Sequence, residues 1–147
     1  MFKISTGLRN YILATGSLSA GLTLGFINIY AGTEPLTADA SIGAATLLCT
    51  VSVDGGATGL TFEAVPAAGV LSKSTTEAWR GTNAATGTAS FYRFVAPGDT
   101  GVESTTERRA QGTVGILNAD LLLASVSLII SQEQRVDFYA IGMPASA

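Results

Sequence analysis

The sequence predicts an all-β fold, a β-sandwich or jelly-roll-like barrel that carries a short helix at its N-terminus. Apolar segments of strand length recur along the chain, Gly- and Pro-containing turns separate them at short intervals, and helical patterns do not alternate with them. We expect one domain over residues 1–147, in which residues 1–16 form a helical arm and residues 24–143 form the sandwich.

The N-terminal segment carries the pattern typical of a helix. Ser5 or Thr6 provides a cap and Gly16 provides a stop. The apolar stripe between them consists of Ile4, Leu8, Tyr11 and Ile12. A helix of about ten residues is marginal in water on its own, so we expect it to dock on the sheet or on a neighbouring subunit. Residues 17–25 are expected to form a loop or a second short turn.

Strand patterns follow in the first half of the chain. Residues 26–30 form the first predicted strand, and residues 31–45 contain a long surface connection. Residues 46–65 predict a hairpin around the glycine-rich break at residues 54–59. The apolar face of its first strand consists of Leu47, Cys49, Val51 and Val53. Residues 70–73 predict a further short strand.

The best-defined strand lies in residues 86–97. Phe91, Arg93 and Val95 point to one face, and Tyr92 and Phe94 point to the other, because successive strand residues alternate sides. A strand that is largely apolar on both faces is normally covered on both, so we place it in the centre of the sheet. Burial of each aromatic side chain would contribute on the order of 1.5 to 3 kcal/mol.

The C-terminal third predicts an edge strand and a closing hairpin. A polar loop leads into an edge strand at residues 110–114. A long strand then covers residues 122–130, a turn covers residues 131–134, and a closing strand covers residues 136–140. The inward face of the long strand would consist of Leu122, Ala124, Val126, Leu128 and Ile130.

Composition restricts the partners that the chain can have. Charged residues make up 13%, about half the share usual in soluble proteins, which predicts a surface of uncharged residues that other chains partly cover. The net charge of −3 leaves no basic surface for nucleic acid. The start of the chain lacks the features of a signal peptide, and the most apolar run, residues 121–130, is shorter than the roughly 20 residues that span a bilayer. We therefore expect a soluble protein with no membrane partner.

Residues that carry chemistry are scarce. The sequence has no histidine, which excludes triads of the Ser-His-Asp and Cys-His kinds. Cys49 lies in an alternating apolar pattern, and we interpret it as a small core residue rather than as a nucleophile. Glycoside hydrolysis needs two carboxylates, so it stays open, although solvated surface residues are the favoured interpretation. The candidate acids are Glu63, Glu77, Glu103, Glu107, Asp120 and Asp137.

No cofactor or metal is expected. The glycine cluster at residues 54–59 lacks the Lys-Ser/Thr ending of a phosphate-binding loop. Asp54 or Asp99 could contact calcium, but no run of alternating acidic ligands accompanies either. Trp79 and Tyr92 could form a carbohydrate platform, although a buried aromatic cluster, with a partner for the indole N–H, is favoured.

The remaining arginines allow two interpretations. Together with Glu103 and Glu107 they could form scattered surface pairs, each worth less than about 1 kcal/mol, or a lock between subunits. The residues concerned are Arg80, Arg93, Arg108 and Arg109.

Several phrases, as a set, resemble a family of small virion structural proteins of tailed bacteriophages. They are residues 5–10 (STGLRN), 25–35 (GFINIYAGTEP), 60–64 (LTFEA), 69–73 (GVLSK), 87–94 (GTASFYRF), 111–115 (QGTVG) and the segment 121–141. None is a catalytic signature, so the resemblance transfers no active-site residues. It implies a non-enzymatic component of the particle, present in the virion after assembly in the host cytoplasm.

The resemblance implies capsid decoration first, with a head-to-tail or tail component as the alternative, and a host-surface glycan-binding module is a further alternative. The expected partners are the major capsid protein or other virion proteins, and a homo-oligomer is expected. We expect residues 1–16 and 97–112 to supply the contacts. The candidate interface residues are Ile4, Leu8, Arg9, Tyr11, Ile12, Arg108 and Arg109.

Overall fold

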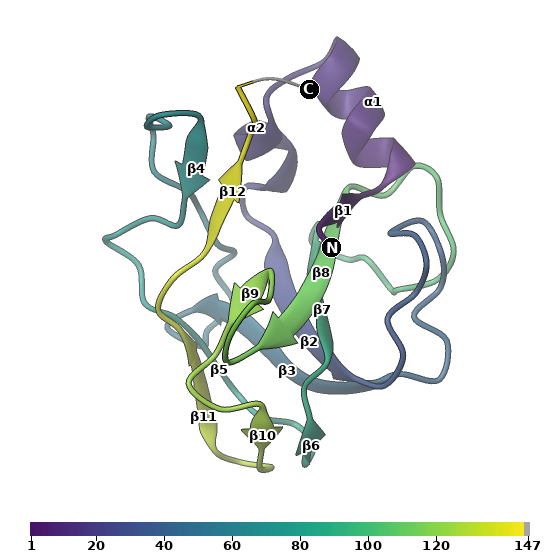
Figure 1. Ribbon diagram of the computed structural model, residues 1–147, viewed down its shortest axis with the longest axis vertical. Coiled ribbons are helices and arrows are strands. Elements are labelled where there is room, and N and C mark those ends of the chain that lie inside the picture. The colour runs from purple at the N-terminus through teal and green to yellow at the C-terminus, as the bar shows by residue number, and fades with distance from the viewer. Residues whose placement is uncertain (146–147) are drawn as a thin grey trace.

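A twisted, largely antiparallel sheet organises the chain in the computed structural model, which describes residues 1–145 (Figure 1). Its strand order is β1-β8-β7-β2-β3-β5-β11, and β9 pairs with β8 in parallel. These strands are β1 (Lys3–Ile4), β2 (Phe26–Ala31), β3 (Thr46–Val53), β5 (Trp79–Thr82), β7 (Phe91–Val95), β8 (Arg109–Gly115), β9 (Leu121–Leu122) and β11 (Glu133–Val136). Two ribbons complete the fold: β4 (Val70–Ser72) with β12 (Ala140–Gly142), and β6 (Gly87–Thr88) with β10 (Ser127–Leu128). The predicted all-β, sandwich-like class is confirmed.

The N-terminal helix is confirmed, but it packs as part of the domain. Helix α1 (Thr6–Ala14) begins after Ser5, whose Oγ accepts the Leu8 N–H at 3.1 Å. Leu8 is completely buried in the core, and β1, just before the helix, pairs with β8. A second helix, α2 (Leu18–Leu22), follows and is capped by Ser17. Residues 1–16 are therefore docked on the sheet of their own chain, which was the first of the two predicted alternatives (Figure 1).

Strand β7 is central, as predicted, because it lies between β2 and β8 and all five of its residues are buried. It is shorter than residues 86–97, since β6 leaves the sheet to pair with β10. The predicted edge strand, β8, is not at the edge: β1 and β9 pair with it on the side away from β7.

The hairpin predicted over residues 46–65 was wrong. Strand β3 pairs with β2 and β5, and the chain after it leaves the sheet, so that Leu60 bridges to Gly25 and Phe62 bridges to Lys73. An irregularity in register between β2 and β3 also changes which residues of β3 point into the core. As a result Leu48 is buried in the core, whereas Leu47 is exposed.

The long strand predicted over residues 122–130 was also wrong. Only β9 and β10 form within it, and Ser125 Oγ accepts the Ser127 N–H at 3.2 Å, which turns the backbone between them. Ile130 points to solvent in consequence. The closing strand likewise divides into β11 and β12, and Phe138 between them is exposed.

The main core is aromatic and lies on one face of the sheet. Its rings are those of Phe62, Trp79, Tyr92, Phe94 and Tyr139. The Trp79 indole N–H donates to Glu77 Oε2 at 2.8 Å, and the Tyr92 and Tyr139 hydroxyls lie 3.0 Å apart. Cys49 is completely buried in this core, and burial raises the pKa of its thiol to about 11. The predicted structural role of Cys49 is confirmed.

Candidate interaction surface

Two arginines lie buried on the face of the sheet opposite the aromatic core. Arg93 in β7 and Arg109 in β8 are both 0% exposed. The strand register pairs Arg93 with Gln111 and Arg109 with Val95, so all four side chains share one face. A buried guanidinium requires a full set of acceptors, because each N–H that leaves water unpaired costs free energy. Two long loops and the Gln111 side chain supply most of these acceptors, and Nη1 of Arg93 is buried without a hydrogen-bond partner.

Arg109 fixes the first loop, residues 96–108. Its Nε donates to Asp99 Oδ2 at 2.6 Å and its second terminal nitrogen donates to Asp99 Oδ1 at 2.8 Å. Both side chains are 0% exposed, which makes this a fully buried, bidentate ion pair. Arg109 also donates to the carbonyls of Val102 at 2.7 Å and Ala38 at 3.2 Å.

Arg93 fixes the second loop, residues 32–45. Its Nε donates to Gln111 Oε1 at 2.7 Å, and a terminal nitrogen donates to the Ala40 carbonyl at 2.6 Å. Burial, together with the nearby positive charge of Arg109, lowers the pKa of Arg93 to about 10. Arg93 therefore stays protonated at neutral pH and holds the backbone of this loop against the sheet.

The two loops also bond to each other, and together we call them the loop lobe (residues 32–45 and 96–108). Ile42 N donates to the Gly101 carbonyl at 3.0 Å, and Ser104 N donates to the Asp39 carbonyl at 2.9 Å. The two segments lie side by side along one flank of the sheet (Figure 1). The loop lobe is thus a fixed structure despite its length.

Asp39 joins the loop lobe to helix α1. Its Oδ1 accepts the Thr6 N–H at 2.7 Å and its Oδ2 accepts the Thr6 hydroxyl at 2.6 Å, at the positive end of the helix. Burial raises the pKa of Asp39, but the hydrogen bonds from Thr6 outweigh that effect, and the pKa lies below its usual value. Helix, loops and sheet therefore form one connected unit.

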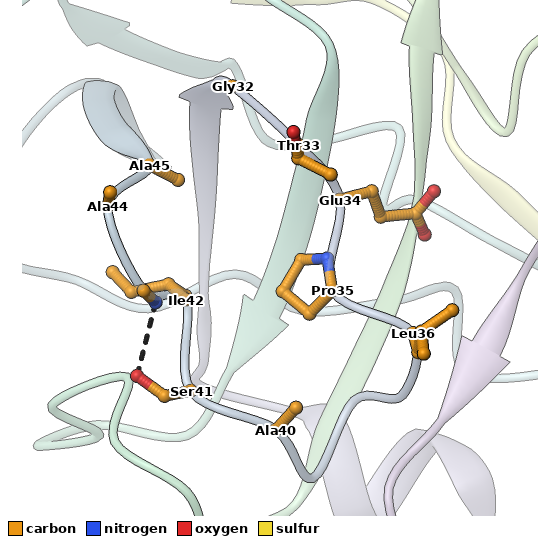
Figure 2. Close-up of a pocket in the computed structure, with 11 residues that line it drawn as sticks. Gly32, Thr33, Glu34, Pro35, Leu36, Ala40, Ser41, Ile42, Ala44 and Ala45 are labelled. Atoms are coloured by element: carbon orange, nitrogen blue, oxygen red, sulfur yellow. Dashed lines mark hydrogen bonds between the residues drawn. The ribbon is translucent and has the colours of Figure 1, made fainter.

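The loop lobe contains an open hollow of about 640 Å³ between the two arms of residues 32–45 (Figure 2). Its lining is mainly alanine, proline and aliphatic side chains, and Leu36 at its rim is 89% exposed. Figure 2 shows Pro35 and Ile42 on the two opposite arms of the hollow, and the Glu34 carboxylate points away from it. Such a lining suits the burial of a partner's apolar side chains.

The predicted interface residues fall into two groups. Arg9 is exposed, and Ile4, Tyr11, Ile12 and Arg108 are half-buried. The Arg108 guanidinium lies 4.7 Å from the centre of the Tyr11 ring, a cation–π contact. Leu8 and Arg109, by contrast, are completely buried inside the chain. For these two residues the prediction of direct partner contact was wrong, because they support the surface from beneath.

The four arginines considered above, Arg80, Arg93, Arg108 and Arg109, do not share one arrangement, whether surface ion pairs or a lock between subunits. Arg93 and Arg109 are internal, and only Arg80 forms a surface pair of the predicted kind, at 3.3 Å from both Asp54 and Glu133. Sequence reasoning missed the buried network. Its one signal was Arg93 itself, a charged residue in a strand that is apolar on both faces.

Trp79 and Tyr92 do not form the carbohydrate platform that the sequence allowed. Trp79 and Tyr92 are both 1% exposed and face the aromatic core. They cannot stack on a sugar without unfolding the sandwich, so the favoured interpretation, a buried cluster, is confirmed.

Three of the six carboxylates considered for hydrolysis, Glu63, Glu77 and Asp120, accept hydrogen bonds within the chain. Glu77 accepts hydrogen bonds from Thr61 and Trp79. Burial raises the pKa of Glu77, but these bonds outweigh it and the pKa is lowered. The pKa of Glu63 is lowered chiefly by the backbone N–H of Thr75. A general acid needs a raised pKa, so neither residue fits that role.

Large apolar side chains are exposed both in the loop lobe and elsewhere on the surface. They are Met1, Leu13, Leu24, Leu36, Leu47, Val65, Val102, Ile116, Leu117, Leu122, Ile129, Ile130, Phe138 and Met143. Leu36 and Val102 belong to the loop lobe. Single exposed apolar side chains are normal on a protein surface, so the others do not by themselves indicate a contact surface.

No family model, curated protein or solved structure matches this chain. Within residues 1–145, no group of three or more potential metal ligands occurs, and no helix is long and apolar enough to cross a membrane.

Proposed function

We propose that the chain is a non-enzymatic structural protein of a tailed-phage virion, and that it decorates the capsid. The observation that carries the proposal is the buried arginine network, which fixes two long loops into the loop lobe. Rigid loops bind without the entropy cost of ordering on contact. A shell protein has to keep its contacts through heat and osmotic stress, so a surface fixed in advance suits this role.

The chemistry of the surface supports the same role. Three carboxylates of the loop lobe are engaged within the chain: Glu34 with Lys3, Asp39 with Thr6, and Asp99 with Arg109. Its outer surface offers Leu36, Val102 and a hollow lined mainly by apolar groups. Such a surface is suited to burial against another protein. The partner that we propose is the major capsid protein, in the assembled shell.

Decoration stabilises a shell by mass action. A protein that binds only the assembled lattice lowers the free energy of that state, by about 2.7 kcal/mol per site when its free concentration is 100 times the dissociation constant. Shells that lack this protein should therefore open at a lower temperature than decorated shells. Equal stability of the two kinds of shell would contradict decoration.

A pair of matched variants tests the docking surface. Leu36→Asp places a charge at the rim of the hollow, where the side chain is 89% exposed, so the fold should not be affected. Val65→Asp makes the same change at a residue that is 78% exposed and lies in the segment before β4, and Figure 1 shows β4 on the side of the molecule away from the loop lobe. Burying a leucine contributes about 1.5 to 3 kcal/mol, so Leu36→Asp should weaken binding to empty shells at least about tenfold.

Co-sedimentation of the purified variants with undecorated shells gives the readout. We expect wild-type protein and Val65→Asp to bind alike and Leu36→Asp to remain in the supernatant. Equal binding of all three would place the docking surface elsewhere. The second candidate, a head-to-tail or tail component, has the same support from the loop lobe, and it would be favoured if the protein bound purified tails or necks but not shells.

A further inference from the structure

Three polar side chains meet where β1 joins the sheet. Lys3 in β1 lies directly opposite Gln111 in β8, and Glu34 approaches both from the loop lobe. Gln111 is 0% exposed, and the side chains of Lys3 and Glu34 are 26% and 19% exposed. The group is thus an amine and a carboxylate that are half-buried, held against a carboxamide that is completely buried.

The two nitrogen atoms share the same acceptors. Lys3 Nζ donates to Glu34 Oε1 at 2.9 Å and to the Pro35 carbonyl at 3.2 Å. Gln111 Nε2 donates to Glu34 Oε1 at 3.2 Å and to the Pro35 carbonyl at 2.8 Å. The shared acceptors hold Lys3 Nζ and the Gln111 carboxamide nitrogen around the same two oxygen atoms, and the strand pairing keeps the two residues opposite each other.

The carboxamide oxygen of Gln111 also has a hydrogen-bond donor. Gln111 Oε1 accepts the Nε–H of Arg93 at 2.7 Å, and Arg93 is itself completely buried. A buried cation that donates to a carbonyl oxygen makes its carbon more electrophilic and stabilises negative charge that develops on the oxygen. An ion pair between Lys3 and Glu34 does not by itself require this third contact.

We propose that Lys3 and Gln111 form an intramolecular isopeptide bond, with Glu34 as the acid–base group and Arg93 as the oxyanion donor. Glu34 accepts one proton from the Lys3 ammonium, and the Nζ lone pair then attacks the Gln111 Cδ. Negative charge moves to Oε1, where Arg93 Nε–H stabilises it. Glu34 returns its proton to Nε2, and the Cδ–Nε2 bond breaks with its electron pair leaving on nitrogen.

The protons balance without any further reactant. The second proton of Nζ passes through Glu34 to the departing ammonia, which leaves as ammonium. Glu34 ends as a carboxylate, and Lys3 Nζ and Gln111 Cδ are joined in a secondary amide. No electron is gained or lost overall. The bond would close a covalent loop between β1 and β8, and it does not depend on the proposed role in a virion.

Mass spectrometry of the purified full chain tests the proposal directly. The intact protein should be lighter than its sequence mass by one ammonia, about 17 Da. Trypsin cannot cleave after an acylated lysine, so the digest should contain a branched peptide in which residues 1–9 are joined to residues 110–135. A full sequence mass after prolonged incubation of the folded protein at pH 8 would overturn the proposal, as would an ammonia loss located at another residue.

Two variants assign the roles. Lys3→Arg keeps the positive charge beside Glu34 but has no amine that can form the bond, and Glu34→Gln keeps the shape but removes the base. Both should show the full sequence mass and no branched peptide, and both should migrate more slowly than wild type in a denaturing gel because no covalent loop closes. Formation of the bond in Glu34→Gln at the wild-type level would overturn the role of Glu34.

Discussion

The buried pair of Arg109 and Asp99 gives the sharpest test of the loop lobe. Replacing Arg109 with Met keeps most of the side-chain volume but removes both hydrogen bonds to Asp99 and those to the carbonyls of Val102 and Ala38. Asp99, whose side chain is 0% exposed, is left as an uncompensated charge. Breaking a buried pair from one side costs about 3 to 5 kcal/mol. That is a large part of the roughly 5 to 15 kcal/mol that stabilises a typical domain.

Thermal and urea denaturation of Arg109→Met, followed by circular dichroism, measures this cost. For a chain of this length, each kcal/mol lowers the Tm by about 2 to 4 °C, so we expect a fall of about 10 °C. Arg80→Met is the matched control, because Arg80 is 35% exposed and its pairs with Asp54 and Glu133 are worth less than about 1 kcal/mol.

A double variant separates charge from packing. Arg109→Met combined with Asp99→Asn no longer contains a buried, unpaired carboxylate, so it should be more stable than Arg109→Met alone. If Arg109→Met lost no more stability than Arg80→Met, the loop lobe would not be held by the buried pair, and the physical basis of the docking surface would be wrong.

Three further results are expected. The pKa of Asp39 is lowered in the folded state, so the stability that Asp39 contributes is present above its ordinary pKa near 4 and is lost as the pH falls below that value. In urea denaturation between pH 7 and pH 3, the Asp39→Asn variant should therefore lose less stability than the wild type. Equal losses would contradict this. Cys49 is 0% exposed and its thiol pKa is raised to about 11, so it should resist a thiol reagent at pH 8 until urea unfolds the chain, whereas rapid labelling of folded protein would show that the core opens. Deletion of residues 1–12 removes Leu8 from the core and β1 from the sheet, so it should lower the Tm, and an unchanged Tm would contradict the docking of this segment on its own sheet.

The sequence predicted those parts of the fold in which local pattern and tertiary packing agree. Strand β7 is buried on both faces because apolar residues occupy both sets of alternating positions, and α1 begins at Ser5 because a serine there can accept the Leu8 N–H. The fold class follows from such segments. These signals are local, so a single chain is enough to detect them.

The errors arose where a neighbouring element decides the outcome. The register irregularity at Leu47 and Leu48 depends on pairing with β2, and the short turn at Ser125 divides a segment whose apolar alternation is otherwise regular. The local sequence pattern does not predict the register irregularity or the turn.

The candidate surface was only partly predictable for a similar reason. Residues 97–112 and the helix were expected to make contacts, and the structure places them on one connected unit. The buried bonds of Arg93 and Arg109 could not be foreseen, because their acceptors are mostly backbone carbonyls far away in the sequence. An arginine in a strand indicates that something must satisfy it, but not which loop will do so.

A cryo-electron microscopy map of the assembled particle tests the central claim most directly. The account predicts density for this fold on the outside of the shell, with residues 32–45 and 96–108 turned toward the capsid lattice. A particle that lacks the protein, or a map in which the loop lobe faces solvent while another face makes the contacts, would contradict it.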